Sequence, residues 1–243
     1  MSHRAILLDI EGTTTSIRFV YDTLFPFARH HVGTFLEGAW GDAAVQSDVD
    51  ALREQAGQDL ADGVTDAPQI PADGSPEVVR AATLANVLWQ MNSDRKTTGL
   101  KGLQGKIWRH GYTSGELLGH IYDDVEPALL AWRDARTPVS IYSSGSVAAQ
   151  KLLFRHSERG DLTPLLASYF DTTTGPKKVA SSYTAIAEAL QCDVGEVLFV
   201  TDSLDEAVAA HEAGVRAILS IRPGNAPLAE HAFQAITSFD ELF

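Results

Sequence analysis

The stretch Ala5–Thr15 constrains the fold most, because an unbroken apolar run ends there in a carboxylate. The first four residues, AILL, do not alternate with polar ones, which predicts a strand covered on both faces, as in a parallel sheet. Such sheets bind ligands at the carboxyl ends of their strands, and Asp9 stands at that end. Gly12 lets the chain turn close to a ligand, and the hydroxyls and amides of Thr13–Thr15 suit an anion.

A carboxylate in this position has two explanations. The simpler one is an acidic residue that ends a strand in a loop and has no chemical role. The other is a nucleophile that attacks phosphorus to give an acyl phosphate. That chemistry requires a divalent metal to neutralise the charge between the two negative groups. The remaining motifs decide between these explanations.

Length and composition exclude several classes of protein. A chain of 243 residues accommodates a large α/β core with a smaller inserted domain, and a hydrophobic fraction of 44% excludes a largely disordered chain. The formal charge of -13 predicts no general attraction to nucleic acid or to anionic membranes. Cys192 is the single cysteine, so no internal disulfide forms. With no signal-type or membrane-spanning apolar run, we expect a cytoplasmic protein.

The pattern after the first strand changes to a helical one. Residues 17–40 carry apolar side chains at helical spacing, whereas residues 42–62 are acidic and weakly patterned. Ser75–Glu77 combines a capping serine, a proline suited to the first turn and an acid at the positive end of the helix dipole. We expect that helix to end near Asn92.

These helices predict a mainly helical cap, residues 17–124, inserted into a core made of residues 1–16 and 125–243. Within the cap, residues 94–108 concentrate positive charge at Arg95, Lys96, Lys101 and Lys106. A solvated helix face would explain this charge. The alternative is contact with an anionic substrate, because an insertion at this point would lie over the carboxyl edge of the sheet and exclude water.

Two further motifs follow predicted strands in the core. Ser143 lies between a strand at residues 139–142 and a helix start, where free backbone amides bind anions. Ser146 is assigned instead to capping that helix. Lys177 follows a short strand near residues 165–171 and would offset the repulsion between a carboxylate nucleophile and a phosphate. Without this context, a lysine at a helix start is usually a surface residue.

A second carboxylate, Asp202, ends the apolar strand at residues 197–201. Asp202 should meet Asp9 across adjacent strands, and hard oxygen ligands of this kind suit Mg²⁺. Glu206 is assigned to structure, because Ser203 and Glu206 match the serine-x-x-glutamate capping box of the next helix. The eight histidines show no metal-binding spacing.

The DIEGT sequence that begins at Asp9, together with Ser143, Lys177 and Asp202, resembles the four motifs of the haloacid dehalogenase superfamily. The resemblance implies a doubly wound, Rossmann-like α/β core with a parallel sheet and Asp9 as nucleophile. It also implies Mg²⁺ bound by Asp9, the backbone at Glu11, and Asp202, with Ser143 and Lys177 holding the phosphoryl group. One departure is that the usual second acid is aspartate, whereas this chain has Glu11.

The glutamate in EGTT, residues 11–14, is similar to the enolase-phosphatases of methionine salvage. Other similar stretches are LQGKIW at 103–108, YSSGS at 142–146, QKLLF at 150–154, YFDT at 169–172 and RPGN at 222–225. The similarity implies a small-molecule substrate, 2,3-diketo-5-methylthiopentyl 1-phosphate, which is enolised and then dephosphorylated. It also implies that Glu11 belongs to the magnesium site and that Ser143, Ser144 and Lys177 contact the substrate. The similarity permits a monomer.

Within this chemistry we expect Glu11 to protonate the leaving oxygen and to activate the hydrolytic water. The base for enolisation stays open between Glu11 and a cap residue such as Lys101. Two other functions remain as alternatives. One is a phosphatase of another small phosphorylated metabolite, and the other is a catalytically silent phosphate-binding module.

Overall fold

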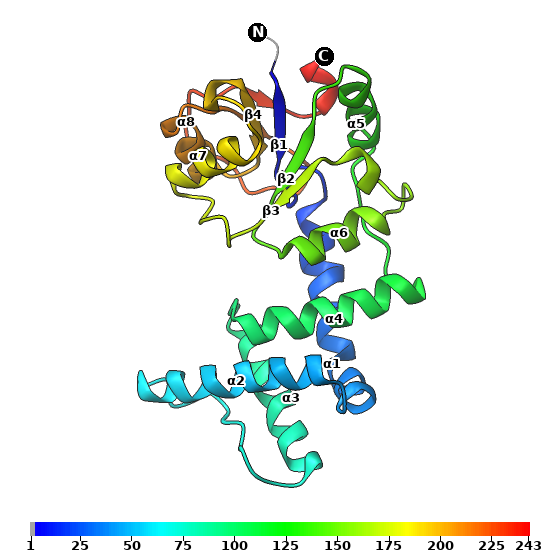
Figure 1. Cartoon of the computed structure of the whole chain (residues 1–243), viewed down its shortest axis with the longest axis vertical. Helices are drawn as coiled ribbons and strands as arrows, with labels where there is room; N and C mark the ends of the chain where they lie inside the picture. Colours follow the sequence, from blue (N-terminus) through cyan, green and yellow to red (C-terminus); the bar gives the residue numbers. More distant parts are fainter. Residues whose placement is uncertain (1–2) are drawn as a thin grey trace. The chain divides into compact units, whose positions relative to one another are not determined.

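A computed structural model describes residues 3–243, and the chain divides into two compact units (Figure 1). The core unit combines Met1–Asp22 with Leu118–Phe243. The helical unit is the continuous segment Thr23–Leu117.

Within residues 3–243, the core unit contains one six-stranded sheet in which all neighbouring strands pair in parallel. The strands are β1 (Ala5–Leu8), β2 (Val139–Tyr142), β3 (Ser168–Phe170), β4 (Val197–Thr201), β5 (Arg216–Ser220) and β6 (Ala235–Ile236). Their order, β3-β2-β1-β4-β5-β6, is that of a doubly wound fold. The predicted fold class is therefore confirmed. The order reverses between β1 and β4, which makes the carboxyl ends of these two strands the switch point where such folds bind ligands.

Helices cover both faces of this sheet (Figure 1). Helices α7 (Ala180–Ala189) and α8 (Leu204–Glu212) lie on one side, and α5 (Val125–Asp134) and α6 (Val147–Arg155) lie on the other. Every residue of β1, β2 and β4 is buried, as expected for strands covered on both faces. Short 3₁₀ turns complete the unit at Thr163–Leu165, Val194–Glu196 and Phe239–Leu242.

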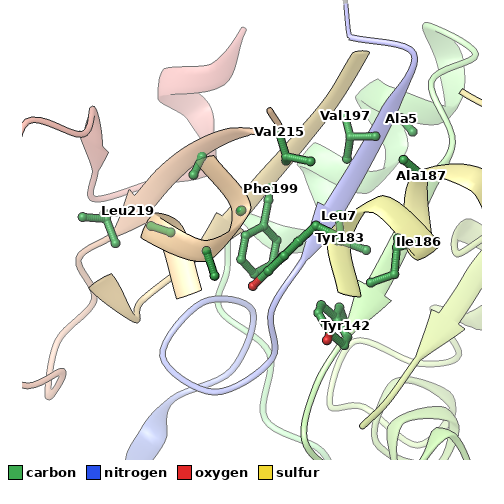
Figure 2. Packing of buried hydrophobic residues seen from close by; sticks show 14 residues of the cluster. Ala5, Leu7, Tyr142, Tyr183, Ile186, Ala187, Val197, Phe199, Val215 and Leu219 are labelled. Atoms are coloured by element: carbon green, nitrogen blue, oxygen red, sulfur yellow. The ribbon is translucent and has the colours of Figure 1, made fainter. Parts of the chain in front are cut away.

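The layer between the sheet and α7 and α8 is apolar and tightly packed. Leu7 and Phe199 project from neighbouring strands into a cluster with Tyr142, Tyr183 and Ile186 (Figure 2). Burying side chains of this size contributes about 1.5–3 kcal/mol each. The cluster therefore holds α7 firmly against β1 and β4, and it places two tyrosine rings beneath the carboxyl edge of the sheet.

The helical unit is built from amphipathic helices that share an apolar interior. A π-helical segment, Phe19–Leu24, leads into α1 (Phe25–Ala39), which is followed by α2 (Ala43–Ala61), α3 (Pro76–Asn92) and α4 (Thr98–Ser114). Helix α2 forms in the weakly patterned acidic segment. The Asp42 carboxylate caps it by accepting from the Ala44 amide at 2.7 Å, and its buried residues recur at helical spacing.

Ion pairs inside the helical unit account for much of the positive charge in residues 94–108. Arg95 Nη2 lies 2.6 Å from Asp59 Oδ1, and Lys106 Nζ lies 2.5 Å from Asp48 Oδ2. Both pairs are partly buried. Arg95 and Lys106 therefore stabilise the packing of helices, so their positive charge is not evidence of substrate contact. Over residues 3–243, no helix combines the length and apolar character needed to cross a membrane.

Candidate active site

Asp9 follows β1 at the switch point and is held in place by its own neighbours. Its amide donates to the Val200 carbonyl of β4, and its Oδ1 accepts from the Ile10 amide at 2.7 Å. Its Oδ2 lies 3.1 Å from the hydroxyl of Thr201, the last residue of β4. The side chain is 6% exposed. Both oxygens of the carboxylate are therefore held in fixed orientations.

Lys177 reaches Asp9 from the loop after β3, as predicted from its place in the sequence. Its ammonium lies 2.6 Å from Asp9 Oδ1 and 2.7 Å from Glu206 Oε2. Burial alone would lower the pKa of Lys177, but the two carboxylates outweigh that effect and raise the pKa. Lys177 therefore stays charged, and it can pair with a phosphoryl oxygen beside Asp9.

Hydroxyl groups fix three carbonyls of the loop that carries Lys177. Tyr183 donates to the carbonyl of Lys177 itself at 2.6 Å. Tyr142 donates to the Gly175 carbonyl, and Ser182 donates to the Pro176 carbonyl, each at 2.8 Å. The two tyrosine rings belong to the apolar cluster of Figure 2. The packing of the core thus determines where the ammonium group of Lys177 lies.

Glu206 belongs to this site, and its assignment to a capping box is wrong. Ser203 is the N-cap of α8, but its side chain makes no capping hydrogen bond. The Glu206 carboxylate turns instead toward Lys177 and lies 2.8 Å from the Thr201 hydroxyl. Burial, and then the charge of Asp9, raise the pKa of Glu206 to about 7. The signal in the sequence was an acid one turn after Asp202, which a local capping pattern also explained.

Asp202 follows β4, beside Asp9. Burial, and then the negative charges of Asp9 and Glu206, raise its pKa to about 7, while Lys177 opposes the shift. The carboxylates of Asp9 and Glu206 contact the ammonium group of Lys177, and Asp202 lies close enough to interact with all three groups. When ionised, the three carboxylates leave an excess of negative charge. A divalent cation would neutralise that excess, and hard oxygen donors are what Mg²⁺ prefers.

In the part of the chain that the structure describes, no three His, Cys, Asp or Glu side chains are grouped as metal ligands. The carboxylates of Asp9 and Asp202 would suit a cation here if a main-chain oxygen completed the donor set. The resemblance noted above implies that this oxygen belongs to Glu11. Glu11 is partly exposed, and its negative charge contributes to the raised pKa of Asp202.

Gly12 brings the loop after β1 against Asp202. Its φ of +66° is in the left-handed region, which glycine adopts without strain. A Cβ at this position would lie 2.2 Å from Asp202 Oδ2. Only a residue without a side chain therefore allows the two loops to approach so closely.

Ser143 lies at the end of β2, on the other side of β1 from Asp202. Its hydroxyl oxygen accepts from the Gly145 amide at 3.1 Å, which leaves the hydroxyl proton available to donate. Ser146 caps α6 by accepting from the Ala149 amide, as predicted. The role of Ser143 in binding phosphate stays a prediction. Ser144 is partly exposed in the same turn.

A cavity of about 530 Å³ lies elsewhere on the core unit, beside the edge strand β3. Its lining includes Lys151, Arg155 and Tyr169 and none of the predicted site residues. The chemistry at the switch point therefore does not depend on that cavity.

The sequence and the fold of this chain are similar to those of known proteins. The model of the haloacid dehalogenase-like hydrolase family matches residues 3–214. The enolase-phosphatase E1 of Synechococcus elongatus is 47% identical over 242 residues, with 100% of this chain and 98% of that protein covered.

Two further matches are a longer plant relative and a solved structure. A probable bifunctional methylthioribulose-1-phosphate dehydratase/enolase-phosphatase E1 of Arabidopsis thaliana is 50% identical, with 98% of this chain but 48% of that protein covered. The chain thus spans about half the length of this plant relative. Among solved structures, the UTR4 protein of Saccharomyces cerevisiae superposes with a TM-score of 0.78 at 31% identity, covering 98% of this chain and 99% of that one.

Proposed function

This chain belongs to the haloacid dehalogenase-like hydrolases and, within them, to the enolase-phosphatase E1 family, and on that premise we propose that it is a magnesium-dependent enolase-phosphatase. Its substrate would be 2,3-diketo-5-methylthiopentyl 1-phosphate, and its products phosphate and the acireductone 1,2-dihydroxy-3-keto-5-methylthiopentene, in methionine salvage. The observation that carries the proposal is the 2.6 Å contact between Lys177 and Asp9 at the switch point of the sheet. The helical unit would serve as the cap.

The phosphatase reaction begins with attack by an Asp9 oxygen on phosphorus. The oxygen–phosphorus bond to Asp9 forms as the ester bond breaks, and Glu11 donates a proton to the leaving oxygen. Lys177 and the hydroxyl of Ser143 stabilise the charge on the transferring oxygens. Glu11 then accepts a proton from water, which hydrolyses the aspartyl phosphate and restores the carboxylate of Asp9.

Asp9, Asp202 and the carbonyl of Glu11 would hold Mg²⁺, which when bound would neutralise phosphate charge and polarise the substrate ketone. Proton removal from carbon during enolisation requires a separate base. Glu11 and Lys101 are the candidates in this proposal.

An Asp9→Asn variant separates the two halves of the reaction. It keeps the size of the side chain and removes the nucleophilic oxygen, so phosphate release should stop. Enolisation needs no attack by Asp9, and the carboxamide oxygen of asparagine can still act as a ligand to Mg²⁺. The absorbance of the enol should therefore still rise when the diketo phosphate and Mg²⁺ are added. Phosphate release at the wild-type rate would reject Asp9 as the nucleophile.

Two measurements on the wild-type chain test the function as a whole. If the enol absorbance does not rise with the diketo phosphate while other phosphate esters are hydrolysed, the chain is a phosphatase of another metabolite. If magnesium-dependent beryllium fluoride does not bind at Asp9, the site is a passive phosphate-binding module.

A further inference from the structure

The RPGN sequence that follows β5 is bound to the loop that follows β1. Arg222 is buried, and its guanidinium donates to the Thr13 carbonyl and pairs with Asp124. Asn225 Nδ2 donates to the Gly12 carbonyl at 2.9 Å and to the Ser220 carbonyl at 3.2 Å. Because β4 lies between β1 and β5, these contacts surround the end of β4, where Asp202 lies.

The two donated hydrogen bonds fix the orientation of the Asn225 carboxamide. A flipped amide would direct its oxygen at two carbonyl oxygens, which are acceptors only. The Asn225 Oδ1 therefore faces away from both carbonyls. It is buried and, among residues 3–243, has no hydrogen-bond partner.

The position of Gly12 shows what this oxygen faces. A Cβ on Gly12 would lie 2.7 Å from Asn225 Oδ1 and 2.2 Å from Asp202 Oδ2. The two oxygens thus lie on the same side of the Gly12 loop, close enough for a single hydrogen-bond donor to reach both. Leaving a buried acceptor without a donor costs about 1–3 kcal/mol, and two facing acceptors also repel. The arrangement is complete only when a donor lies between them.

We propose that Asn225 is a positioning residue of the cation site: its Oδ1 accepts a hydrogen bond from a water molecule coordinated to a divalent cation at Asp202. Its Nδ2 meanwhile holds the Gly12 loop in place. This inference rests on the proposed function, because that function supplies the cation. Mg²⁺ in proteins keeps several of its waters, and such a water can donate one proton to Asn225 Oδ1, which has no other donor among residues 3–243, and its second proton to Asp202. Through Asn225, the loop after β5 therefore contributes to the affinity of the site for the cation.

The test measures cation binding directly, by calorimetric titration of the metal-free full chain with Mg²⁺. Asn225→Leu removes the acceptor, and Mg²⁺ affinity should fall about 10–100-fold, as it does when other partners of metal-bound groups are removed. Asn225→Asp removes the donor but keeps an acceptor, so affinity should stay at the wild-type level or rise. The water-proton relaxation caused by bound Mn²⁺, which reports exchange of coordinated water, should change in Asn225→Leu.

Asn86→Leu is the matched control. Asn86 is a buried asparagine whose Nδ2, like that of Asn225, donates to a carbonyl, that of Pro68 at 2.7 Å, but it belongs to the helical unit. This variant should lower the melting temperature and leave Mg²⁺ affinity unchanged.

The outcomes separate the inference from the function on which it rests. If Asn225→Asp weakens Mg²⁺ binding as much as Asn225→Leu, the side chain acts only by holding Gly12, and the inference is wrong while the enzyme assignment stands. Wild-type Mg²⁺ affinity in Asn225→Leu would likewise show that the inference is wrong, while the enzyme assignment stands. If the wild-type chain binds no Mg²⁺ and releases phosphate in the presence of a chelator, the proposed cofactor is wrong, and the inference falls with it.

Discussion

Tyr183→Phe tests the link between core packing and the position of Lys177. The substitution removes one oxygen atom and keeps the ring, whose centroid lies 5.6 Å from that of Tyr142 and 5.2 Å from that of Phe199. The apolar cluster should therefore stay intact. What is lost is the 2.6 Å hydrogen bond to the Lys177 carbonyl, which is then buried without a donor.

Leaving that carbonyl unsatisfied should lower the free energy of unfolding by about 1–3 kcal/mol. For a chain of this size, each kcal/mol lowers the melting temperature by about 2–4 °C. The carbonyl belongs to Lys177, whose ammonium group contacts Asp9. Loss of the hydrogen bond should therefore let the loop shift and displace the ammonium group from Asp9. A displacement of about 1 Å in a positioned group can reduce turnover about 10²-fold. We therefore expect a loss of stability together with a lower kcat for phosphate release.

Tyr169→Phe is the matched control. The Tyr169 hydroxyl is buried, and within the described residues it has no hydrogen-bond partner. Its removal should leave both the melting temperature and kcat unchanged, or raise the melting temperature slightly. Calorimetry and a phosphate-release assay on the two variants decide the matter. Equal shifts in melting temperature, or an unchanged kcat in Tyr183→Phe, would refute the argument that this hydroxyl positions Lys177.

Three further substitutions probe the rest of the structure. Glu206→Gln keeps the size of the side chain but removes the negative charge 2.7 Å from Lys177, so kcat for phosphate release should fall about 10²-fold without loss of the fold, as judged by circular dichroism. Gly12→Ala introduces about 1–2 kcal/mol of backbone strain and a Cβ 2.2 Å from Asp202, so calorimetry should show weaker Mg²⁺ binding. Lys106→Met leaves its aspartate partner unpaired and should cost about 1–3 kcal/mol in chemical denaturation, with KM unchanged.

Each of these expectations has a result that contradicts it. Wild-type turnover in Glu206→Gln would show that Lys177 needs Asp9 alone. For Gly12→Ala the control is Gly105→Ala, because a Cβ at Gly105 would meet nothing within 4 Å. This control substitution should stabilise α4 by about 0.5–1 kcal/mol. Equal Mg²⁺ affinity in these two glycine variants would contradict the close approach at Gly12. A raised KM in Lys106→Met would mean that this lysine contacts substrate after all.

Much of the core could be predicted from local patterns. The apolar runs that end before Asp9, Ser143 and Asp202 coincide with β1, β2 and β4 residue for residue. A strand buried on both faces is mainly apolar, and the polar residues within these strands, Ser140 and Thr201, are small and buried. The end of each strand is therefore visible in the sequence where the apolar run stops. In a parallel sheet those polar residues meet at one edge, which is why a doubly wound fold with its chemistry at that edge could be inferred.

Local patterns failed where two explanations fitted the same residue. Glu206 matched a capping motif, yet its carboxylate pairs with the buried ammonium group of Lys177, which lies 29 residues earlier in the chain. Lys106 and Arg95 looked like an anion-binding stretch, but aspartates of α2 neutralise them. Asn225 lay in a turn whose role no local pattern indicated.

Strands could be predicted and these side-chain partners could not, for a physical reason. Whether a strand is buried depends on its own side chains, so that property can be read along the chain. The partner of a buried charge or amide depends on which distant segments the sheet order brings together, and desolvation then forces those groups to pair. The strands and the carboxylates at their ends followed from the residues themselves, whereas the pairing of Glu206 with Lys177 and of Asn225 with Gly12 arises only once β3, β4 and β5 lie in their places.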